Sequence, residues 1–247
     1  METVVLTASA GSFPGLAEAL KQLSLVVEER PLLKFSPPTD WTGLDAAISR
    51  LNSYGAIAFT SPRAGRVFSD RWKSQGTSRP NGGPTPEVWA SGAGTKAALG
   101  GIFRAVRVPP AAGESGAAAS LARAMIDARV RGPVLFPCGD LRRDELPGKL
   151  RRHGIEVEEV ICYRSVLAGE AEAREAASRG TLLVVASPSV ADLLARSCPP
   201  DHRPELVAVG PTTATASRSA GWPPAAVSAE PSTGALASTI AELLRHR

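Results

Sequence analysis

The chain has 247 residues, 43% of them hydrophobic and 21% charged, which is ordinary for a folded protein with one large or two small domains. No apolar run reaches the roughly 18 residues that a membrane-spanning helix needs, and no basic segment typical of a secretion signal opens the chain. The sequence therefore predicts a cytoplasmic protein without a membrane segment. Its formal net charge of +4 comes from scattered Lys and Arg, which argues against a nucleic-acid partner and weakly favours acidic ligands.

Short apolar runs alternate with amphipathic helical segments, with turns rich in Gly, Ser or Pro between them. The apolar runs are, in chain order, 4–6, 56–59, 88–90, 106–108, 134–136, 182–185 and 206–209. The helical segments that follow them are 14–23, 62–74, 95–99, 115–129, 143–153, 188–197 and 211–220. Continuous apolar strands that alternate with helices indicate parallel sheets covered on both faces. We therefore expect a doubly wound α/β fold.

Internal similarity within the chain predicts two related α/β domains. The similar pairs of segments are 59–64 with 185–190, 92–97 with 210–215, and the strand–helix–strand unit 4–29 with 134–160. Because a strand-to-helix turn recurs in each pair, the same local architecture is expected twice.

Two extended stretches, 30–36 and 160–167, lie outside the repeated pattern. If they pair as antiparallel strands, the chain leaves its first domain early, builds the second and then returns to complete the first. The predicted boundaries are 1–33 plus 166–247 for the first domain and 37–162 for the second. This double crossover predicts a cleft between two domains.

Two Ser-Pro turns each end an apolar strand and begin a helix. Ser61 and Ser187 suit the N-cap position, and Pro62 and Pro188 suit the first helical position, where an N–H is not needed. Ser-Pro starts helices in any protein, so a single copy indicates only local structure. Two copies at equivalent places leave a binding role open beside the structural one.

Two Gly-x-x-Thr turns have the same arrangement. Gly92 and Gly210 allow the backbone to turn tightly after a strand. The next residues, Gly94 with Thr95 and Thr212 with Thr213, place hydroxyl and N–H groups at a helix start, where carboxylates or phosphates bind. In open parallel sheets the ligand crevice lies at this end of the strands.

A third such turn is Cys138-Gly139-Asp140, which Arg142 and Arg143 follow. No Gly-x-Gly-x-x-Gly, Walker or Gly-x-Ser-x-Gly motif occurs, so nothing indicates a nucleotide site or a nucleophile elbow. Three widely spaced cysteines and three histidines predict neither a disulfide framework nor a zinc site. The turns therefore predict a polyanion site, with no metal and no cofactor.

The residues at these turns resemble the motifs of uroporphyrinogen-III synthases. Residues 59–64 resemble the first Thr-Ser-Pro element of that family, 186–189 the second, and 209–214 its Gly-Pro-Thr-Thr element. Residues 139–164 are similar to the family's Arg-x-x-Leu-x-x-x-Leu-x-x-x-Gly…Tyr pattern. The resemblance covers nearly the whole chain in order.

The resemblance implies two flavodoxin-like α/β domains joined by a two-stranded antiparallel β-ladder. It implies an enzyme that closes hydroxymethylbilane, a linear tetrapyrrole with eight carboxylates, into uroporphyrinogen III with inversion of the last pyrrole and loss of water. Such a substrate needs many N–H and hydroxyl donors from both domains. The substrate-binding residues that we expect are Ser61, Pro62, Gly92, Gly94, Thr95, Gly139, Arg143, Ser187, Pro188, Ser189, Gly210, Thr212 and Thr213.

Tyr163 matches the family's tyrosine near the hinge, and the resemblance implies that it assists departure of the substrate hydroxyl as a hydrogen-bond donor. Packing within the ladder is the alternative role. The chain departs from the family pattern at residues 7–10, Thr-Ala-Ser-Ala, where many relatives have Thr-Arg-Pro, and at Ala186, where they have Thr. The first change removes one partner for a carboxylate.

Two other functions compete with this interpretation. A non-catalytic binder of tetrapyrroles or small polyanions would use the same scaffold and the same backbone donors. A periplasmic-type binding protein also has two α/β domains, but the order of the motifs and the missing export signal argue against it. No excess apolar face is evident, so a monomer is expected.

Overall fold

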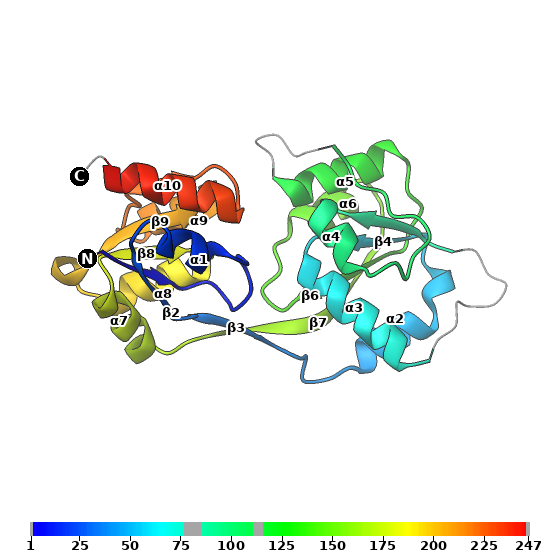
Figure 1. Cartoon of the computed structure of the whole chain (residues 1–247). Helices are drawn as coiled ribbons and strands as arrows, with labels where there is room; N and C mark the ends of the chain where they lie inside the picture. The colour runs from blue at the N-terminus through cyan, green and yellow to red at the C-terminus, as the bar shows by residue number, and fades with distance from the viewer. Residues whose placement is uncertain (1, 77–84, 111–115, 246–247) are drawn as a thin grey trace. The chain divides into compact units, whose positions relative to one another are not determined.

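A computed structural model describes residues 2–76, 85–110 and 116–245 (Figure 1). The chain divides into unit 1, formed by Met1–Phe35 and Val166–Arg247, and unit 2, formed by Ser36–Ser165. Each unit is built around one five-stranded sheet, and two strands of the second sheet cross the boundaries between the units, at residues 35–36 and 165–166. Since unit 1 comes from both ends of the chain, the segment that builds unit 2 interrupts it.

The sheet of unit 1 has the strand order β10-β9-β8-β1-β2, and every neighbouring pair is parallel. Its strands are β1 (Thr3–Leu6), β2 (Val26–Glu29), β8 (Leu182–Val185), β9 (Glu205–Val209) and β10 (Ala226–Ser228). All four residues of the central strand β8 are buried. A continuous apolar run such as Leu-Leu-Val-Val fits a parallel strand that is covered on both faces.

Helices cover both faces of the unit 1 sheet (Figure 1). On one face α1 (Leu16–Lys21) packs beside α10 (Thr233–Arg245). On the other face α7 (Glu170–Arg179), α8 (Pro188–Ser197) and α9 (Pro211–Ser219) pack side by side, and a short 3-10 turn, η2 (Pro200–His202), follows α8. These layers bury Leu16, Leu20 and Ile240 on the first face and Leu193, Leu194 and Ala214 on the second.

Unit 2 repeats this layered construction. Its sheet has the order β3-β7-β6-β4-β5, built from β3 (Leu33–Ser36), β4 (Ala56–Phe59), β5 (Glu87–Ala90), β6 (Val134–Gly139) and β7 (Val157–Leu167). One face carries α2 (Thr42–Ser49), η1 (Leu51–Ser53), α3 (Pro62–Ser74) and α4 (Ala93–Ala98), and the other carries α5 (Ala117–Asp127) and α6 (Glu145–Arg152). Aromatic rings fill the first face, where Phe59 and Phe68 meet edge to face with centroids 5.3 Å apart.

The strand order locates the ligand-binding end of each sheet. In unit 1 the sheet reads 2-1-3-4-5 in chain order, the flavodoxin-like arrangement, and its direction reverses between β1 and β8. In unit 2 the strands β4, β5, β6 and β7, numbered 1 to 4 in chain order, stand in the order 2-1-3-4, and β3 lies at the edge beside β7. The direction of this sheet reverses between β4 and β6. The predicted doubly wound α/β class is therefore confirmed. Ligands of such sheets bind beyond the carboxyl ends of the strands at the reversal, which is called the switch point.

Several local predictions differ from the structure. Residues 106–108 do not form a strand, since only Arg107 bridges to Trp89 and two prolines, which lack an N–H, follow at once. The helices α2, α7 and α10 have no counterpart among the predicted elements. The predicted start of a helix at Ser115 lies outside the described residues, and α5 is described from Ala117. Within the described ranges no helix has the length and apolar character to cross a membrane.

Candidate active site

The switch point of unit 2 lies between the end of β4 and the end of β6. Ser61 follows β4 and is the N-cap of α3, where its Oγ accepts a hydrogen bond from the Ala64 N–H at 3.1 Å. Pro62 occupies the first helical position, as predicted. Together Ser61 and Pro62 start a 13-residue helix directly beyond a fully buried strand.

Tyr163 lies on β7, where it faces Gly139 at the end of β6. A Cβ atom added to Gly139 would stand 2.6 Å from Cε2 and Cζ of the tyrosine ring, so the ring lies against the bare glycine backbone. The Tyr163 hydroxyl forms a hydrogen bond with the Ser61 side chain. Three predicted site residues, Ser61, Gly139 and Tyr163, are therefore brought together in one unit.

Burial raises the pKa of the Tyr163 hydroxyl above its ordinary value. The hydrogen bond with Ser61 and the positive charge of Arg63 act in the opposite direction but do not cancel the effect of burial. A phenol with a raised pKa keeps its proton at neutral pH and acts as a hydrogen-bond donor. Arg63 was not among the expected site residues, although it belongs to the segment 59–64, and its positive charge acts on the tyrosine hydroxyl.

The turn after β5 contributes further polar groups to unit 2. The Ser91 Oγ donates to the Thr60 carbonyl at 3.1 Å and lies 3.4 Å from Oγ1 of Thr95, a residue that is itself 4% exposed. Gly94 is exposed and lies near Pro62. Gly92 has a φ of −176°, so its extended backbone does not require glycine, contrary to the expected tight turn.

A charged loop follows Gly139. Arg142 and Arg151 both bind the carboxylate of Glu159, Arg151 through Oε1 at 2.7 Å, and these two guanidinium groups hold the pKa of Glu159 below its ordinary value against the effect of burial. Arg143 is exposed and makes only a loose ion pair with Glu145 at 3.6 Å. Arg142 therefore anchors the loop, while Arg143 leaves its guanidinium in solvent.

The equivalent Ser-Pro turn of unit 1 has a different hydrogen-bond pattern. Ser187 occupies the N-cap position of α8 and Pro188 the first helical position, but the Ser187 side chain does not cap the helix. Its hydroxyl instead lies 2.8 Å from the Ser189 hydroxyl. Both serines therefore occupy the predicted N-cap position, but only the Ser61 side chain caps its helix.

At the end of β9, Gly210 has a φ of +82°, a conformation that favours glycine, and it leads into α9. Thr212 is exposed at the start of this helix, whereas Thr213 is only 2% exposed and lies in the interior. Of the two threonines that were expected to present hydroxyls, the structure leaves only Thr212 accessible from outside.

Unit 1 contains a pocket of about 210 Å³ at its switch point. The loop after β1 and the turn after β8 supply its polar side, with Ser9, Ser12 and Ser187. Its apolar side comes from Phe13, Leu33, Phe35 and Val190. The Ser9 and Ser12 hydroxyls lie 2.7 Å apart, so one of the two hydrogens remains for a ligand. This pocket can hold a flat apolar ring that carries a hydrogen-bond acceptor.

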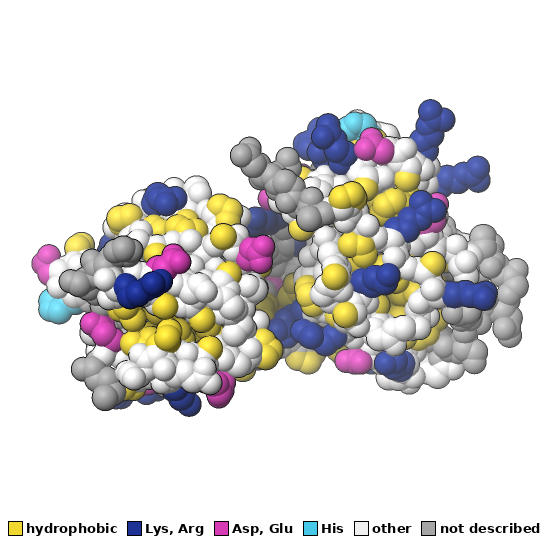
Figure 2. Space-filling view, turned by 45° about the horizontal axis from the view of Figure 1, so that its top comes forward, with side chains coloured by type: hydrophobic (Ala, Val, Ile, Leu, Met, Phe, Trp, Pro, Cys, Tyr) yellow, Lys and Arg dark blue, Asp and Glu magenta, His cyan; other side chains and the backbone are white. Residues whose placement is uncertain are grey.

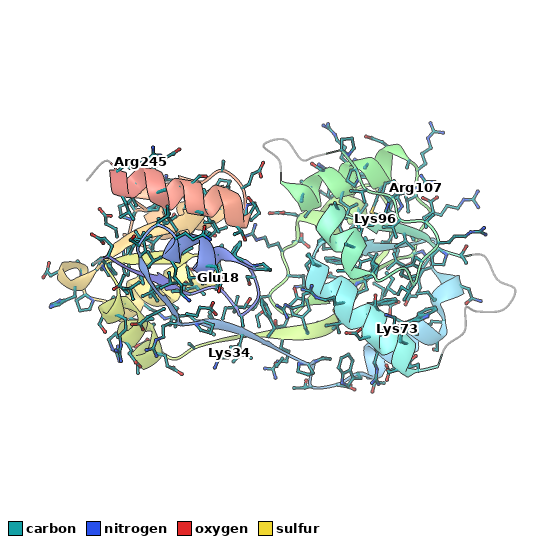
Figure 3. All side chains as sticks on the ribbon, viewed as in Figure 1. Glu18, Lys34, Lys73, Lys96, Arg107 and Arg245 are labelled. Atoms are coloured by element: carbon teal, nitrogen blue, oxygen red, sulfur yellow. The ribbon has the colours of Figure 1, made fainter. Side chains whose placement is uncertain are left out.

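The basic side chains of unit 2 do not gather into one patch on the faces that the figures show. Figure 2 shows Lys and Arg groups separated by polar and apolar surface. Figure 3 labels Lys73 on α3, Lys96 on α4 and Arg107 after β5, and all three are exposed. Over the part of the chain that the structure covers, no three His, Cys, Asp or Glu side chains are arranged to hold a metal ion.

Sequence reasoning missed the aromatic residues Phe13 and Phe35 and the role of Ser91. The two phenylalanines lie outside the repeated motifs, and 22 positions separate them in the sequence, although both line the same pocket. Ser91 stands directly before the Gly92 turn, so its position in the sequence could have identified it as a further polar residue of the site.

The chain is similar to proteins of one known family. The family described as "Uroporphyrinogen-III synthase HemD" matches residues 15–238, which is most of the chain. No curated protein sequence matches the chain.

Two solved structures share the fold over the full length of both chains. A mutant uroporphyrinogen III synthase from Thermus thermophilus has a TM-score of 0.70 at 15% sequence identity. A uroporphyrinogen-III synthetase from Helicobacter pylori has a TM-score of 0.63 at 17% identity. At such identities the likeness supports the two-unit α/β fold, and the family match carries the assignment.

Proposed function

The chain belongs to the uroporphyrinogen-III synthase family, and we propose that the turns at its two switch points bind the substrate and that Tyr163 assists the first chemical step. The family closes hydroxymethylbilane, a linear tetrapyrrole, into uroporphyrinogen III, with inversion of the last pyrrole and loss of water in haem biosynthesis. Hydroxymethylbilane carries eight carboxylates, so hydrogen-bond donors matter more for its binding than any single charged residue.

Each unit supplies such donors at its switch point. In unit 2 the candidates are Ser61, Pro62, Gly92, Gly94, Thr95, Gly139 and Arg143, through backbone N–H groups where these exist, through hydroxyls, and through one exposed guanidinium. In unit 1 they are Ser187, Pro188, Ser189, Gly210, Thr212 and Thr213. The burial of Thr95 and Thr213 favours their backbone over their hydroxyls as the contacting groups. Serine pairs such as Ser187 with Ser189 retain one free hydrogen for a carboxylate.

The position of Tyr163 is the single observation that carries the proposal. Its protonated hydroxyl lies beside Ser61 at the switch point of unit 2, which is where ligands of such sheets bind. The hydroxymethyl C–O bond breaks with its electron pair on oxygen while the pyrrole nitrogen donates electrons, and the N–H proton of that ring is then lost to the departing hydroxide, which leaves a neutral azafulvene and water. A hydrogen bond from Tyr163 to the departing oxygen stabilises the charge that develops there.

The later steps use the reactivity of the pyrroles themselves. The electrophilic azafulvene carbon is attacked by the substituted carbon of the last ring, which gives a spiro intermediate that fragments and closes again with that ring inverted. Here the protein holds one conformation of the chain and suppresses direct closure, because a positioned pair of carbons reacts faster than a free one.

A coupled isomer assay tests this function. Purified protein is mixed with freshly generated hydroxymethylbilane, the product is oxidised, and the uroporphyrin isomers are separated. The proposal expects mainly the type III isomer, and the same protein after heat denaturation serves as the control. If the folded protein yields only the spontaneous type I isomer, the enzymatic function is wrong and a non-catalytic tetrapyrrole or polyanion binder becomes the better interpretation.

We also propose that the protein works in the cytoplasm as a monomer. The three cysteines are free and buried, which suits a reducing compartment. The large hydrophobic side chains that are exposed in the described residues are scattered over several elements rather than gathered on one helix. Sedimentation equilibrium measures the monomer mass directly, and cell fractionation measures the compartment.

A further inference from the structure

The ladder between β6 and β7 is interrupted next to Tyr163. The two strands pair in register from Val134 with Val157 to Cys138 with Ile161. The next pair is Gly139 with Tyr163, so the ladder skips Cys162. This irregularity leaves one extra residue on β7, which turns the strand locally and re-aims the side chain that follows.

Asp140 closes the ladder beyond this irregularity. Its backbone N–H donates to the carbonyl of Tyr163 at 3.2 Å. Its carboxylate Oδ1 accepts from the Ser165 N–H at 2.8 Å and from the Leu141 N–H at 3.0 Å. The aspartate therefore holds the β7 backbone at the Tyr163 carbonyl and at the Ser165 N–H, directly after the tyrosine side chain.

Gly139 supplies the space that the tyrosine ring occupies. An added Cβ would lie 2.6 Å from two ring carbons and 2.9 Å from the hydroxyl oxygen, distances that are too short for a real contact. The backbone of Gly139 is not in the left-handed region, so the reason for glycine is this close approach and not backbone strain. Any larger residue must displace the ring.

We propose that Asp140 and Gly139 are positioning residues for Tyr163 that fix where its hydroxyl points. Asp140 fixes the β7 backbone at Tyr163, and Gly139 allows the tyrosine ring to lie directly against the β6 backbone. The inference rests on the proposed function of Tyr163 for its catalytic consequence, but the geometric part stands on the contacts themselves. A hydroxyl held in one place is needed because small displacements of a reacting group are costly in rate.

The ion pair between Asp140 and Arg164 offers a different explanation for the aspartate. Arg164 Nε lies 4.0 Å from Asp140 Oδ2, and its side chain is 49% exposed. A long, exposed pair of this kind contributes little to stability. Asparagine at position 140 removes the charge that pairs with Arg164 but keeps an oxygen for the N–H groups of Leu141 and Ser165. The Asp140→Asn variant therefore separates an ion-pair role from a backbone-holding role.

The test uses the full chain labelled with 13Cζ-tyrosine. The protein has two tyrosines, so the Tyr163→Phe variant assigns both NMR signals. Tyr54, whose hydroxyl donates to Glu158 at 2.8 Å, serves as the internal reference. Asp140→Ala, Asp140→Asn and Gly139→Ala are compared, and the exposed Asp127→Ala at the end of α5 is the matched control. Initial rates and isomer yields are measured on the same samples.

Asp140→Ala is expected to shift the Tyr163 signal and to lower kcat about tenfold with little change in KM, while the Tyr54 signal stays in place. Asp140→Asn is expected to recover most of the lost kcat. In the Tyr163→Phe background, Asp140→Ala is expected to cost little more, because the two residues act through one hydroxyl. Gly139→Ala gives the same signature independently, should Asp140→Ala not fold.

Two results overturn the proposal: an unmoved Tyr163 signal in both Asp140→Ala and Gly139→Ala, or an equal loss from Asp140→Ala with and without the tyrosine hydroxyl. A failure of the proposed function is distinguishable from these. If Tyr163→Phe keeps full activity while Asp140→Ala still moves the Tyr163 signal, the positioning stands and the catalytic role of the tyrosine is wrong.

Discussion

Ser61 and Ser187 stand at equivalent positions in the two units, yet their hydroxyls have different partners. Each follows a buried strand and precedes a proline at the first helical position. Ser61 accepts a hydrogen bond from the Ala64 N–H at 3.1 Å, whereas Ser187 pairs with the Ser189 hydroxyl at 2.8 Å. The same dipeptide therefore stabilises its helix in unit 2 and leaves the helix N-terminus of unit 1 without a side-chain cap.

This difference predicts unequal losses of stability. Ser61→Ala removes a helix cap and is expected to lower the free energy of unfolding by about 1 kcal/mol. Ser187→Ala is expected to cost clearly less, because its hydroxyl does not bind the helix backbone. Urea unfolding followed by far-UV circular dichroism measures both variants. Equal losses would show that the Ser187 hydroxyl caps α8 in solution.

Tyr163→Phe tests the proposed donor directly. The variant keeps the ring against Gly139 but removes the hydroxyl, so we expect kcat to fall by about 10- to 100-fold while KM and the unfolding free energy change little. Activity does not vanish, because positioning and pyrrole reactivity remain. Steady-state rates with an isomer analysis provide the measurement.

Tyr54→Phe is the matched control for that experiment. Its hydroxyl donates to Glu158 and is expected to affect stability but not turnover. Unchanged kinetics in Tyr163→Phe would remove the tyrosine from the mechanism and leave binding to the turns.

The two threonines of the α9 turn are expected to respond differently. Thr212 is exposed, so Thr212→Val removes a hydroxyl that substrate can reach and is expected to raise KM several-fold. Thr213 is 2% exposed, so Thr213→Val is expected to change the unfolding free energy rather than KM. The reverse pattern would mean that α9 opens at its start when substrate binds.

The sequence was sufficient for the fold because its strongest signals are local. Strands such as Ala56–Phe59 and Leu182–Val185, and the Ser-Pro and Gly-Pro helix starts, are specified by adjacent residues. The helix α7 was missed for a physical reason: its buried face consists of Ala173, Ala176 and Ala177, which give no large apolar period.

The site was only partly predictable, since several of its relationships span many residues. Asp140 binds Ser165 across 25 positions, and the need for this contact arises from a register shift that no local pattern announces. Likewise Thr95 and Thr213 occupy predicted positions, but the direction of their side chains follows from the packing of α4 and α9. The sequence motifs therefore predict where the turns lie, whereas the packing of the helices determines which atoms of each turn face outward.

Alkaline stability should depend on the buried thiols. Burial raises the pKa of Cys138 and of Cys162 to about 12, from an ordinary value of 9.0. The folded state holds these protons more tightly than the unfolded chain does. The thiols' contribution to the free energy of unfolding is therefore fully present below pH 9 and is lost as the pH rises toward 12. We expect the unfolding free energy to fall by up to about 1.4 kcal/mol per pH unit for each thiol above pH 9.

The Cys138→Ala/Cys162→Ala variant isolates that effect. It is expected to be less stable at pH 8 because of lost packing, but its stability should decline less steeply between pH 9 and pH 11. Urea midpoints at several pH values measure the slope. An unchanged slope would assign the alkaline loss to other groups, such as Tyr163, whose pKa burial also raises.

Filling the unit 1 pocket tests whether substrate enters it. Ala8 and Ala186 both line this pocket of about 210 Å³, so Ala8→Leu or Ala186→Leu fills part of its space. If one substituted pyrrole of the substrate enters there, KM is expected to rise about tenfold, while the unfolding free energy changes by about 1 kcal/mol or less. Ala10→Leu, in the same loop but exposed, is the matched control and is expected to leave KM unchanged.

The ratio of type III to type I product adds a second readout to the pocket variants. A ring that no longer fits leaves the substrate less firmly held, so the uninverted closure competes and the type I share rises along with KM. A raised KM with an unchanged isomer ratio would mean that the pocket contributes to affinity alone. An unchanged KM in both filled variants would exclude the pocket from substrate binding and restrict the unit 1 contacts to the turns at Ser187 and Gly210.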